Sequence, residues 1–248
     1  MGARQYSDGI AEFYDSYYGP QSDLEFYRNL AADTDGPVLE VGCGTGRIYL
    51  SLLKDDIDTD GIDVSPEMVS TLREKADDEG LDSNVRQADV TEFESDRSYA
   101  LVIAPFRVFM NLLTPEDQLA ALTRVYEALE PGGTLAFNVF SPDYDIICSD
   151  YGEWDERMVS VDGRQLRFRM RTEIADPVAN HARLTLRIET ESGDRVREES
   201  KLLNLCSRDT YDLLFRLSPF STWSVYGGFD RQPLESTTQE MVWLAQKK

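Results

Sequence analysis

Three glycines spaced two residues apart constrain this chain more than any other feature. Gly42, Gly44 and Gly46 follow a short apolar run at residues 38–41 and precede a second apolar run at residues 48–53. A buried strand, a tight glycine turn and a helix form the first half of a nucleotide-binding α/β unit. Glycine permits a positive φ and allows a ligand to lie directly on the backbone. The sequence therefore predicts a ligand site at the turn between this strand and this helix.

The glycine spacing and a nearby acid indicate which ligand is bound. Dinucleotide folds use G-x-G-x-x-G, and the N-terminus of the following helix faces a pyrophosphate. Here the third glycine comes one residue early, and Glu40 stands two residues before the first glycine. A carboxylate at that place would repel a pyrophosphate but suits a ligand with an ammonium group. S-adenosylmethionine is such a ligand, because it has an amino-acid tail and a cationic sulfonium and carries no phosphate.

Two further acids follow at the ends of predicted strands. Asp63 lies in a predicted second strand at residues 61–65, 17 residues after the last glycine of the turn. An acid at the tip of that strand can accept hydrogen bonds from both hydroxyls of a ribose. A third strand, at about residues 84–88, is followed by Asp89 and Val90, which we expect to hold an adenine. These positions match an adenosine lying along one edge of the sheet.

The remaining strands complete the pattern of one family. We expect strands at residues 99–104 and 134–140, the latter after a Pro-Gly-Gly turn, and a closing hairpin with strands at residues 222–226 and 240–245. In this order and spacing the chain resembles the class I S-adenosylmethionine-dependent methyltransferases. The resemblance implies an α/β fold with a doubly wound seven-stranded sheet, in the order 3-2-1-4-5-7-6 with strand 7 antiparallel. It also implies S-adenosyl-L-methionine as methyl donor, S-adenosyl-L-homocysteine as product, and no metal.

The resemblance further implies two sets of site residues. The cofactor-binding set comprises Tyr14, Glu40, Gly42, Cys43, Gly44, Gly46, Asp63, Val64, Met68, Asp89, Val90 and Ala104. The set lining the methyl-acceptor pocket comprises Tyr17, Phe106, Arg107, Asn111 and Phe140. Residues 226–230 read Tyr-Gly-Gly-Phe-Asp and resemble a turn of sugar-amine N-methyltransferases. Asp230 is therefore the first candidate for a catalytic base, although it can equally cap its own turn.

After the fifth strand the pattern changes to a two-residue period. At residues 166–171 and 183–188, apolar side chains alternate with polar ones, mostly arginines, which predicts half-buried strands. We therefore divide the chain into a Rossmann-like methyltransferase domain at residues 1–140 and 207–248, with a helical N-terminal cover, and an antiparallel β insert at residues 141–206. Because ligands bind at the carboxyl edge of open α/β sheets, we expect the insert to form a lid over the acceptor pocket.

The polar residues of the insert admit two interpretations. The arginines can face an anionic substrate, or they can form cross-strand pairs with glutamates such as Glu173, Glu189 and Glu198. Acids and arginines are interleaved throughout the insert, and we therefore favour the pairs. The lone histidine, His181, is expected to be an exposed turn residue.

The charge composition bears on the source and on partners. The net charge is −21, with five lysines against twenty arginines. An acidic, lysine-poor surface is expected in a molar-salt cytoplasm, where charges are screened beyond a few ångströms. We therefore expect a halophilic, archaeal source. The alternative is a merely acidic mesophilic protein.

Nucleic-acid binding depends on basic side chains that neutralise phosphates. The chain offers no basic run, which counts against DNA or RNA as substrate.

Several other features narrow the setting. The sequence shows neither an apolar stretch of membrane-span length nor an apolar N-terminal signal region. Cys43, Cys148 and Cys206 have no C-x-x-C spacing, and with one histidine they provide no metal site. We therefore expect a reduced, cytoplasmic protein that acts as a monomer or a homodimer.

Alternative functions are distinguished by single features. Nucleic-acid amino-methyltransferases carry Asn/Asp-Pro-Pro-Tyr/Phe after the fourth strand, and Ala104-Pro105-Phe106 departs from that pattern. A nicotinamide oxidoreductase is disfavoured by the glycine spacing. A non-catalytic S-adenosylmethionine-binding regulatory protein would lack an enclosed acceptor pocket. We therefore expect methyl transfer to a nitrogen or oxygen of a small-molecule acceptor.

Overall fold

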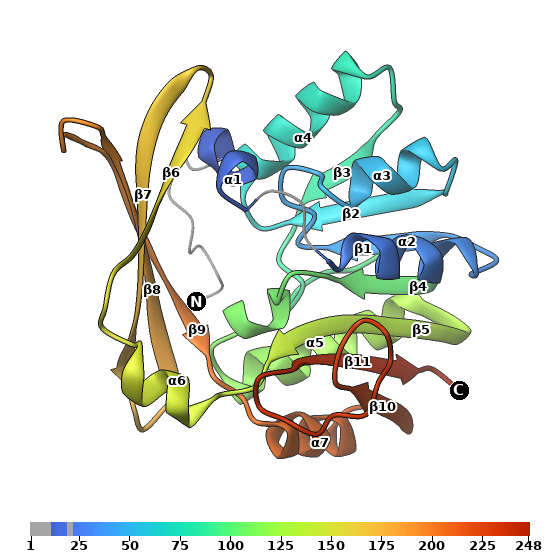
Figure 1. The fold of residues 1–248 in the computed structure, drawn as a ribbon. Helices are drawn as coiled ribbons and strands as arrows, with labels where there is room; N and C mark the ends of the chain where they lie inside the picture. Colours follow the sequence, from blue (N-terminus) through green and yellow to red (C-terminus); the bar gives the residue numbers. More distant parts are fainter. Residues whose placement is uncertain (1–10, 19–21) are drawn as a thin grey trace.

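Two β-sheets organise the residues that the computed structural model describes, 11–18 and 22–248 (Figure 1). The first ten residues of the expected N-terminal cover lie outside the described residues. The helices are α1 (Ala11–Tyr18), α2 (Leu24–Ala32), α3 (Tyr49–Lys54), α4 (Pro66–Asp78), the 3-10 helix η1 (Val108–Asn111), α5 (Pro115–Ala128), α6 (Tyr144–Ser149) and α7 (Arg208–Leu217). The strands are β1 (Val38–Val41), β2 (Thr59–Asp63), β3 (Asn84–Gln87), β4 (Tyr99–Ala104), β5 (Leu129–Phe140), β6 (Asp155–Val161), β7 (Arg164–Asp176), β8 (His181–Thr190), β9 (Arg195–Asn204), β10 (Thr222–Tyr226) and β11 (Glu240–Gln246).

The larger sheet has seven strands in the order β3-β2-β1-β4-β5-β11-β10. The pairs from β3 to β5 are parallel, whereas β11 runs antiparallel to both β5 and β10. The predicted order 3-2-1-4-5-7-6 and its antiparallel strand are therefore confirmed. Parallel neighbours all end at one edge, so the tips of β1, β2, β3 and β4 lie together there.

Helices cover both faces of this sheet, which explains why its central strands, β1 and β4, are apolar apart from Glu40. Alternate residues of a strand point to opposite faces. On one face Val38, Leu101 and Ile103 pack with residues of α2 and α3. On the other face Leu39 and Val102 belong to the cluster that includes α5 and α7. Every residue of β1 and β4 is buried as a result.

The expected start of the fifth strand is wrong by five residues. The sequence predicts a turn at Pro-Gly-Gly followed by a strand from residue 134, but β5 already begins at Leu129 and runs through that turn. The backbone of Lys247 accepts from Gly132 and donates to Gly133, both over 2.9 Å. The Lys247 ammonium also donates to the Leu129 carbonyl over 2.6 Å. Leu129 itself pairs with Tyr99 of β4, which extends the strand, and the contacts with Lys247 hold the backbone of the turn to the residue that follows β11.

The smaller sheet, β6-β7-β8-β9, is antiparallel throughout, and we call it the insert sheet. It stands beside the edge at which the parallel strands end (Figure 1). Phe168 and Ile188 pack against Phe13 and Tyr17 of α1 and against Met68 of α4. At the other end of the insert sheet, Ala182 and Leu203 join the main core cluster. The insert sheet is thus attached to the larger domain at both ends.

The other face of the insert sheet carries charged pairs. Arg169 lies 3.4 Å from Glu156, Arg171 lies 3.1 Å from Glu173, and Arg187 lies 2.6 Å from Glu198. All three guanidinium groups also lie within about 5 Å of the Trp154 ring, a cation–π arrangement. The interpretation that the arginines pair with glutamates is therefore confirmed.

Among the helices of the described residues, none combines the length and the apolar composition of a membrane span.

Candidate functional site

The glycine turn after β1 lies at the carboxyl edge of the larger sheet. Gly44 has a φ of 54° and open space where a side chain would begin, and it lines a cavity. Gly46 has a φ of 95°, and a Cβ there would lie 2.9 Å from both Leu50 and Leu72. Gly44 therefore presents backbone to the cavity, whereas Gly46 lets α3 and α4 pack closely.

Asp63 joins this turn to the tip of β2. One carboxylate oxygen accepts from the Gly44 N–H over 2.9 Å, and the other accepts from the Ser65 N–H over 2.8 Å. Burial raises the pKa of Asp63, while these backbone donors and the charge of Lys201 lower it. The remaining acceptor capacity of the carboxylate can serve a ligand, because each oxygen has a second lone pair.

A cavity of about 110 Å³ lies between these elements. Most of the predicted cofactor residues line it: Tyr14, Gly42, Gly44, Asp63, Val64, Met68, Asp89 and Val90. Phe106 and Asn111 of the predicted acceptor set also line it. The structure therefore brings together residues from α1, α4, the loops after β1 to β4, and η1. Glu40, Cys43, Gly46 and Ala104 do not line the cavity; Glu40, Cys43 and Ala104 are buried behind it.

Glu40 is buried beneath the glycine turn, with 3 % of its surface exposed. Its Oε2 atom has no hydrogen-bond partner among the described residues. Burial holds the pKa of this carboxyl well above its ordinary value, although the nearby charge of Arg47 lowers it. Arg47 itself is committed to Asp23 through two bonds of 2.6 and 2.8 Å. A buried acid of this kind is stabilised when a cationic group binds beside it.

Asp89 is held in a tight turn at the end of the third strand. One of its carboxylate oxygens accepts from the backbone N–H of Thr91 over 3.0 Å and from its hydroxyl over 2.8 Å. Val90 beside it is buried. The turn fixes an acceptor and an apolar surface next to each other on the cavity wall.

The loop after β4 supplies an aromatic wall. Phe106 and Arg107 both have a positive φ, 53° and 65°, which is rare for residues with a side chain. The Phe106 ring meets Tyr14 edge to face, with centroids 6.4 Å apart, and the Arg47 guanidinium lies 5.5 Å from its centre. This unusual backbone turns the Phe106 ring toward the cavity.

Arg107 and Phe140 do not line the cavity. Arg107 donates to Glu240 through two bonds of 2.9 and 2.8 Å and lies 5.0 Å from the centre of the Phe140 ring. Glu240 also accepts from buried Asn138 over 2.6 Å, and Asn138 accepts from the hydroxyl of Tyr27 over 2.8 Å. This chain of contacts links the loop after β4 to β11, β5 and α2.

Two other predicted residues lie away from the cavity. Tyr17 stacks on Phe168 of the insert sheet, with ring centroids 5.2 Å apart, and the guanidinium of Arg157 lies over the Tyr17 ring. Asp230 is exposed and is not among the described residues that line the cavity. Its neighbour Phe229 packs on Phe26 and Tyr27 of α2. The catalytic role of Asp230 stays a prediction that this geometry does not support.

The sequence interpretation missed Lys201, which lines the cavity from β9. The sequence feature that could have indicated Lys201 is the rarity of lysine, because the chain contains only five. His181 was also misjudged: it begins β8, is half-buried, and hydrogen-bonds the Leu113 carbonyl over 2.9 Å. Within residues 11–18 and 22–248, no cluster of three or more His, Cys, Asp or Glu side chains could hold a metal ion.

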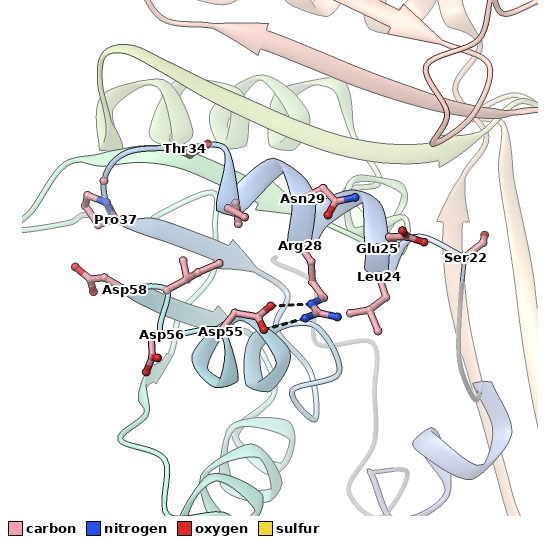
Figure 2. Close-up of a pocket in the computed structure, with 14 residues that line it drawn as sticks. Ser22, Leu24, Glu25, Arg28, Asn29, Thr34, Pro37, Asp55, Asp56 and Asp58 are labelled. Carbon is pink, nitrogen blue, oxygen red and sulfur yellow. Dashed lines mark hydrogen bonds and ion pairs between the residues drawn. The ribbon is translucent and has the colours of Figure 1, made fainter.

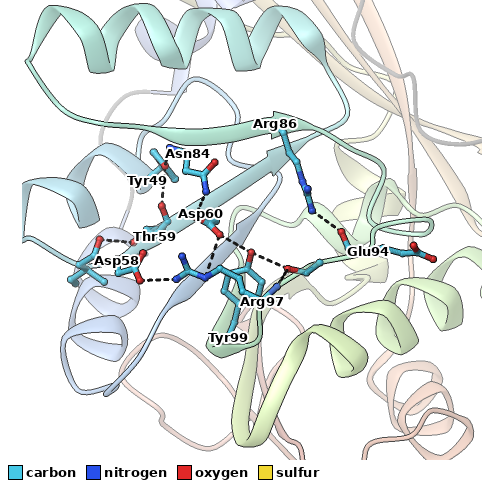
Figure 3. Close-up of polar contacts among 11 residues, drawn as sticks. Tyr49, Asp58, Thr59, Asp60, Asn84, Arg86, Glu94, Arg97 and Tyr99 are labelled. Carbon is cyan, nitrogen blue, oxygen red and sulfur yellow. Dashed lines mark hydrogen bonds and ion pairs between the residues drawn. The ribbon is translucent and has the colours of Figure 1, made fainter.

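Two further cavities lie at the opposite, amino-terminal edge of the larger sheet. The larger, of about 970 Å³, is an open groove in which Arg28 and Asp55 form a two-bond ion pair (Figure 2). The other, of about 190 Å³, surrounds buried Asp60, which accepts from Asn84 and from the Tyr99 hydroxyl, each over 2.7 Å (Figure 3). Both are lined by charged side chains that already pair with one another. The candidate site is therefore the cavity of about 110 Å³ at the glycine turn.

Comparisons with known proteins identify the domain that contains the glycine turn. Residues 38–133 match a family model described as a methyltransferase domain. The chain is 32 % identical over 98 residues to the dTDP-3-amino-3,4,6-trideoxy-alpha-D-glucopyranose N,N-dimethyltransferase of Streptomyces venezuelae, covering 40 % of each protein. It is 34 % identical over 136 residues to the phosphatidylethanolamine N-methyltransferase of Cereibacter sphaeroides, covering 52 % of this chain and 64 % of that protein. The first curated relatives are matched over 37–42 % of their own length.

One solved structure covers nearly the whole of both chains. The CcbJ methyltransferase of Streptomyces caelestis superimposes with a TM-score of 0.82 at 23 % identity, covering 100 % of this chain and 99 % of that one. At 23 % identity the similarity shows a shared fold, and the superposition includes the insert sheet. Residues 38–133 are therefore a methyltransferase domain, and the chain has the fold of the class I S-adenosylmethionine-dependent methyltransferases.

Proposed function

We propose that this protein binds S-adenosylmethionine in the cavity at the glycine turn and transfers its methyl group to an amine nitrogen of a small-molecule acceptor. The observation that carries the proposal is the buried Glu40 carboxyl, with one oxygen unpartnered among the described residues, directly beneath the turn. The ammonium group of the methionyl tail would compensate this acid. Asp63 would accept from the ribose hydroxyls, and Asp89 with Val90 would hold the adenine.

The residues around the cavity match the chemical groups of the cofactor, but the volume of the cavity is too small to hold it without a change in the walls. Pockets for ligands of this class have volumes of roughly 300 Å³ or more, whereas the cavity measures about 110 Å³. The walls contributed by α1 and by the loop after β4 must therefore move apart when the cofactor binds. These walls belong to different elements, which allows them to separate without unfolding the sheet.

The bound cofactor supplies an electrophilic methyl group on a sulfonium, with a neutral thioether as the leaving group. The protein must align the nucleophile with that methyl group and exclude water. Tyr14 and Phe106 supply an apolar wall for this purpose. A hydroxyl acceptor would also need a base to remove its proton. Asp63 and Asp89 are the acids among the described residues lining the cavity, and both are assigned to the cofactor. This favours an amine, because its unprotonated form has a free lone pair and needs no base on the protein.

The similar proteins support this acceptor class without defining it. They include an N,N-dimethyltransferase of an amino sugar nucleotide and an amino pentose methyltransferase, CalS10 of Micromonospora echinaspora. The insert sheet contributes Lys201 to the cavity wall, and a lid formed by this sheet would suit a small molecule better than a polymer.

We also infer that the protein works in the cytoplasm of a halophilic organism. The net charge of −21 would cause strong self-repulsion in dilute salt. Cys43, Cys148 and Cys206 are free thiols, which fits a reducing compartment.

Calorimetry in concentrated KCl tests the cofactor assignment. We expect S-adenosylmethionine and S-adenosylhomocysteine to bind with roughly micromolar affinity, about 8 kcal/mol, and NADH not to bind. The acceptor class is tested with a panel of amino sugars and matched sugars that carry a hydroxyl instead. Formation of S-adenosylhomocysteine with the amines alone is expected. Turnover of the hydroxyl set alone would overturn the nitrogen assignment, and binding without any turnover would favour a regulatory protein.

A further inference from the structure

The insert sheet contributes a charged residue to the cofactor cavity. Lys201 on β9 lines the cavity together with Asp63 and Asp89. In the β8–β9 register Lys201 stands opposite Leu184, and Leu203 stands opposite Ala182. Because side chains alternate along a strand, Lys201 shares the face of buried Leu203, which packs into the main core. The side chain of Lys201 therefore belongs to the inner face of the insert sheet.

A pair of hydrogen bonds fixes β9 close to this position. His181 and Asn204 are direct partners across the β8–β9 ladder. The His181 Nε2 lies 2.9 Å from the Leu113 carbonyl oxygen, and the Asn204 side-chain amide donates to the same oxygen over 2.8 Å. A carbonyl oxygen only accepts, so this histidine nitrogen carries the proton. Leu112, the preceding residue, lines the cavity. The insert sheet is thus held to the cavity wall three residues from Lys201.

Lys201 lines the cavity, whereas three other lysines have their partners elsewhere. Lys54 pairs with Glu79, Lys75 pairs with Asp15, and Lys247 donates to carbonyls near the end of α5. Among the described residues that line the cavity, Lys201 is the one cation. In a chain with a net charge of −21, this places positive charge beside the acid assigned to the ribose.

We propose that Lys201 completes the cofactor site from the insert sheet, with its ammonium group facing Asp63 so that the ribose-binding carboxylate is ready only when the insert sheet is in place. This inference rests on the proposed function. Lys201 is a positioning residue, because it acts on the ligand through Asp63. The insert sheet thereby governs retention of the cofactor as well as access of the acceptor.

Other groups around Asp63 set the direction of the effect. Burial raises the pKa of Asp63, and Lys201 and the backbone N–H groups of Gly44 and Ser65 lower it. Glu40 and Cys43 interact electrostatically with Asp63 from below the turn, and Asp89 lines the same cavity. A neutral side chain in place of the ammonium group removes one of the groups that lower the pKa of Asp63, while the neighbouring acids and the burial remain. The pKa of Asp63 then rises, and ligand affinity is lost at a higher pH.

The test measures S-adenosylhomocysteine binding by calorimetry from about pH 5 to pH 8. The variants are Lys201→Met, which removes the charge, Lys201→Arg, which keeps it, and Lys54→Met, which removes the same charge from an exposed pair. For Lys201→Met we expect roughly tenfold weaker binding near neutral pH, with the pH at which affinity falls shifted upward. Lys201→Arg should restore the wild-type pH profile, and Lys54→Met should match the wild type throughout.

The outcomes separate this inference from the proposed function. If the wild type binds S-adenosylhomocysteine and Lys201→Met binds within twofold at every pH, the role of Lys201 is overturned. An equal loss in Lys54→Met would also overturn it, because the effect would then come from net charge. If the wild type binds neither S-adenosylhomocysteine nor S-adenosylmethionine, the proposed function itself fails. Melting temperatures identify a variant that has unfolded, and Lys201→Arg then decides the matter through its pH profile.

Discussion

The backbone N–H of Gly44 donates to a carboxylate oxygen of Asp63 over 2.9 Å, so the glycine turn after β1 and the tip of β2 are joined by a direct bond. The two residues are 19 positions apart in the chain: Gly44 lies in the turn after β1, and Asp63 ends β2, the parallel neighbour of β1. The bond orients the carboxylate and the turn relative to each other before any ligand contact forms. Pre-organisation of this kind reduces the ordering that binding requires.

Replacing Asp63 with asparagine should weaken cofactor binding more than it weakens the fold. Asparagine keeps an oxygen that can accept from Gly44, but it has no charge with which to bind two ribose hydroxyls. We expect S-adenosylhomocysteine to bind about 2 kcal/mol more weakly, roughly 30-fold, as measured by calorimetry. Asp89→Asn is the matched control and should cost less, because both bonds from Thr91 go to one oxygen of Asp89, and asparagine keeps one such oxygen. Unchanged affinity in Asp63→Asn would contradict the ribose assignment.

Glu40→Gln should make the ligand-free protein more stable and the complex weaker. Burial raises the pKa of Glu40, so above about pH 4 the native state retains a proton that the unfolded chain has released. Stability of the wild type therefore falls as pH rises, until Glu40 ionises in the native state. Glutamine has no proton to lose, so the variant should gain on the order of 1 kcal/mol at neutral pH.

Denaturant unfolding at several pH values checks this expectation. The gain should vanish at about pH 4, where glutamate is largely protonated in both states. Calorimetry of the same variant should show weaker S-adenosylhomocysteine binding, because the ammonium group of the ligand no longer has the Glu40 carboxylate as a partner. A variant that is less stable than the wild type at neutral pH would show that Glu40 is ionised and compensated without a ligand.

Arg107 offers a test of backbone strain at the aromatic wall. With a φ of 65°, the residue lies in the left-handed region, which is unfavourable for side chains but open to glycine. Arg107→Gly and Arg107→Ala both remove the contact with Glu240, but only glycine relieves the strain. We therefore expect Arg107→Gly to be more stable than Arg107→Ala by about 1 kcal/mol in denaturant unfolding.

The same pair of substitutions at Arg216 is the control. Arg216 lies in α7 and pairs with Asp212 one turn earlier. Glycine is about 1 kcal/mol worse than alanine inside a helix, so the order of stability should reverse there. The same order at both sites would indicate that the backbone at Arg107 is not strained.

Stability should increase with salt if the acidic surface is an adaptation to molar salt. The net charge of −21 repels itself across the surface, and added KCl screens that repulsion. Thermal unfolding followed from roughly 0.1 M KCl into the molar range should show a steadily rising melting temperature. A flat or falling melting temperature over that range would count against a halophilic source.

Local sequence features predicted the larger sheet and the cofactor edge of the site. The turn at Gly42 to Gly46, Asp63 and Asp89 each follow a strand at short range, and the parallel topology then brings the strand ends together. Ser65, which is followed by Pro66 and Glu67, caps the next helix, because its hydroxyl accepts from the Met68 N–H over 3.3 Å. Such contacts depend on spacing along the chain, which a sequence displays directly.

The features that were missed depend on pairing between distant segments. Arg107 was assigned to the acceptor pocket, but its partner Glu240 lies 133 residues later on β11. Tyr17 packs on Phe168 of the insert sheet, and Lys201 reaches the cavity only because β9 is fixed at Leu113. The expected start of the second strand was also two residues late, because residues 59 and 60 pair with β1 despite their polar side chains. Register between separate elements decides each of these cases, and no local pattern encodes it.

The position of β11 between β5 and β10 has a consequence for synthesis of the chain. While the ribosome makes the insert sheet, α7 and β10, one edge of β5 has no partner, because β11 is made after all of them. An open strand edge can pair with the same edge of another nascent chain. Residues 240–246 of β11 fill this edge, because they pair with β5 on one side and with β10 on the other. The larger sheet therefore closes only after β11 has been made.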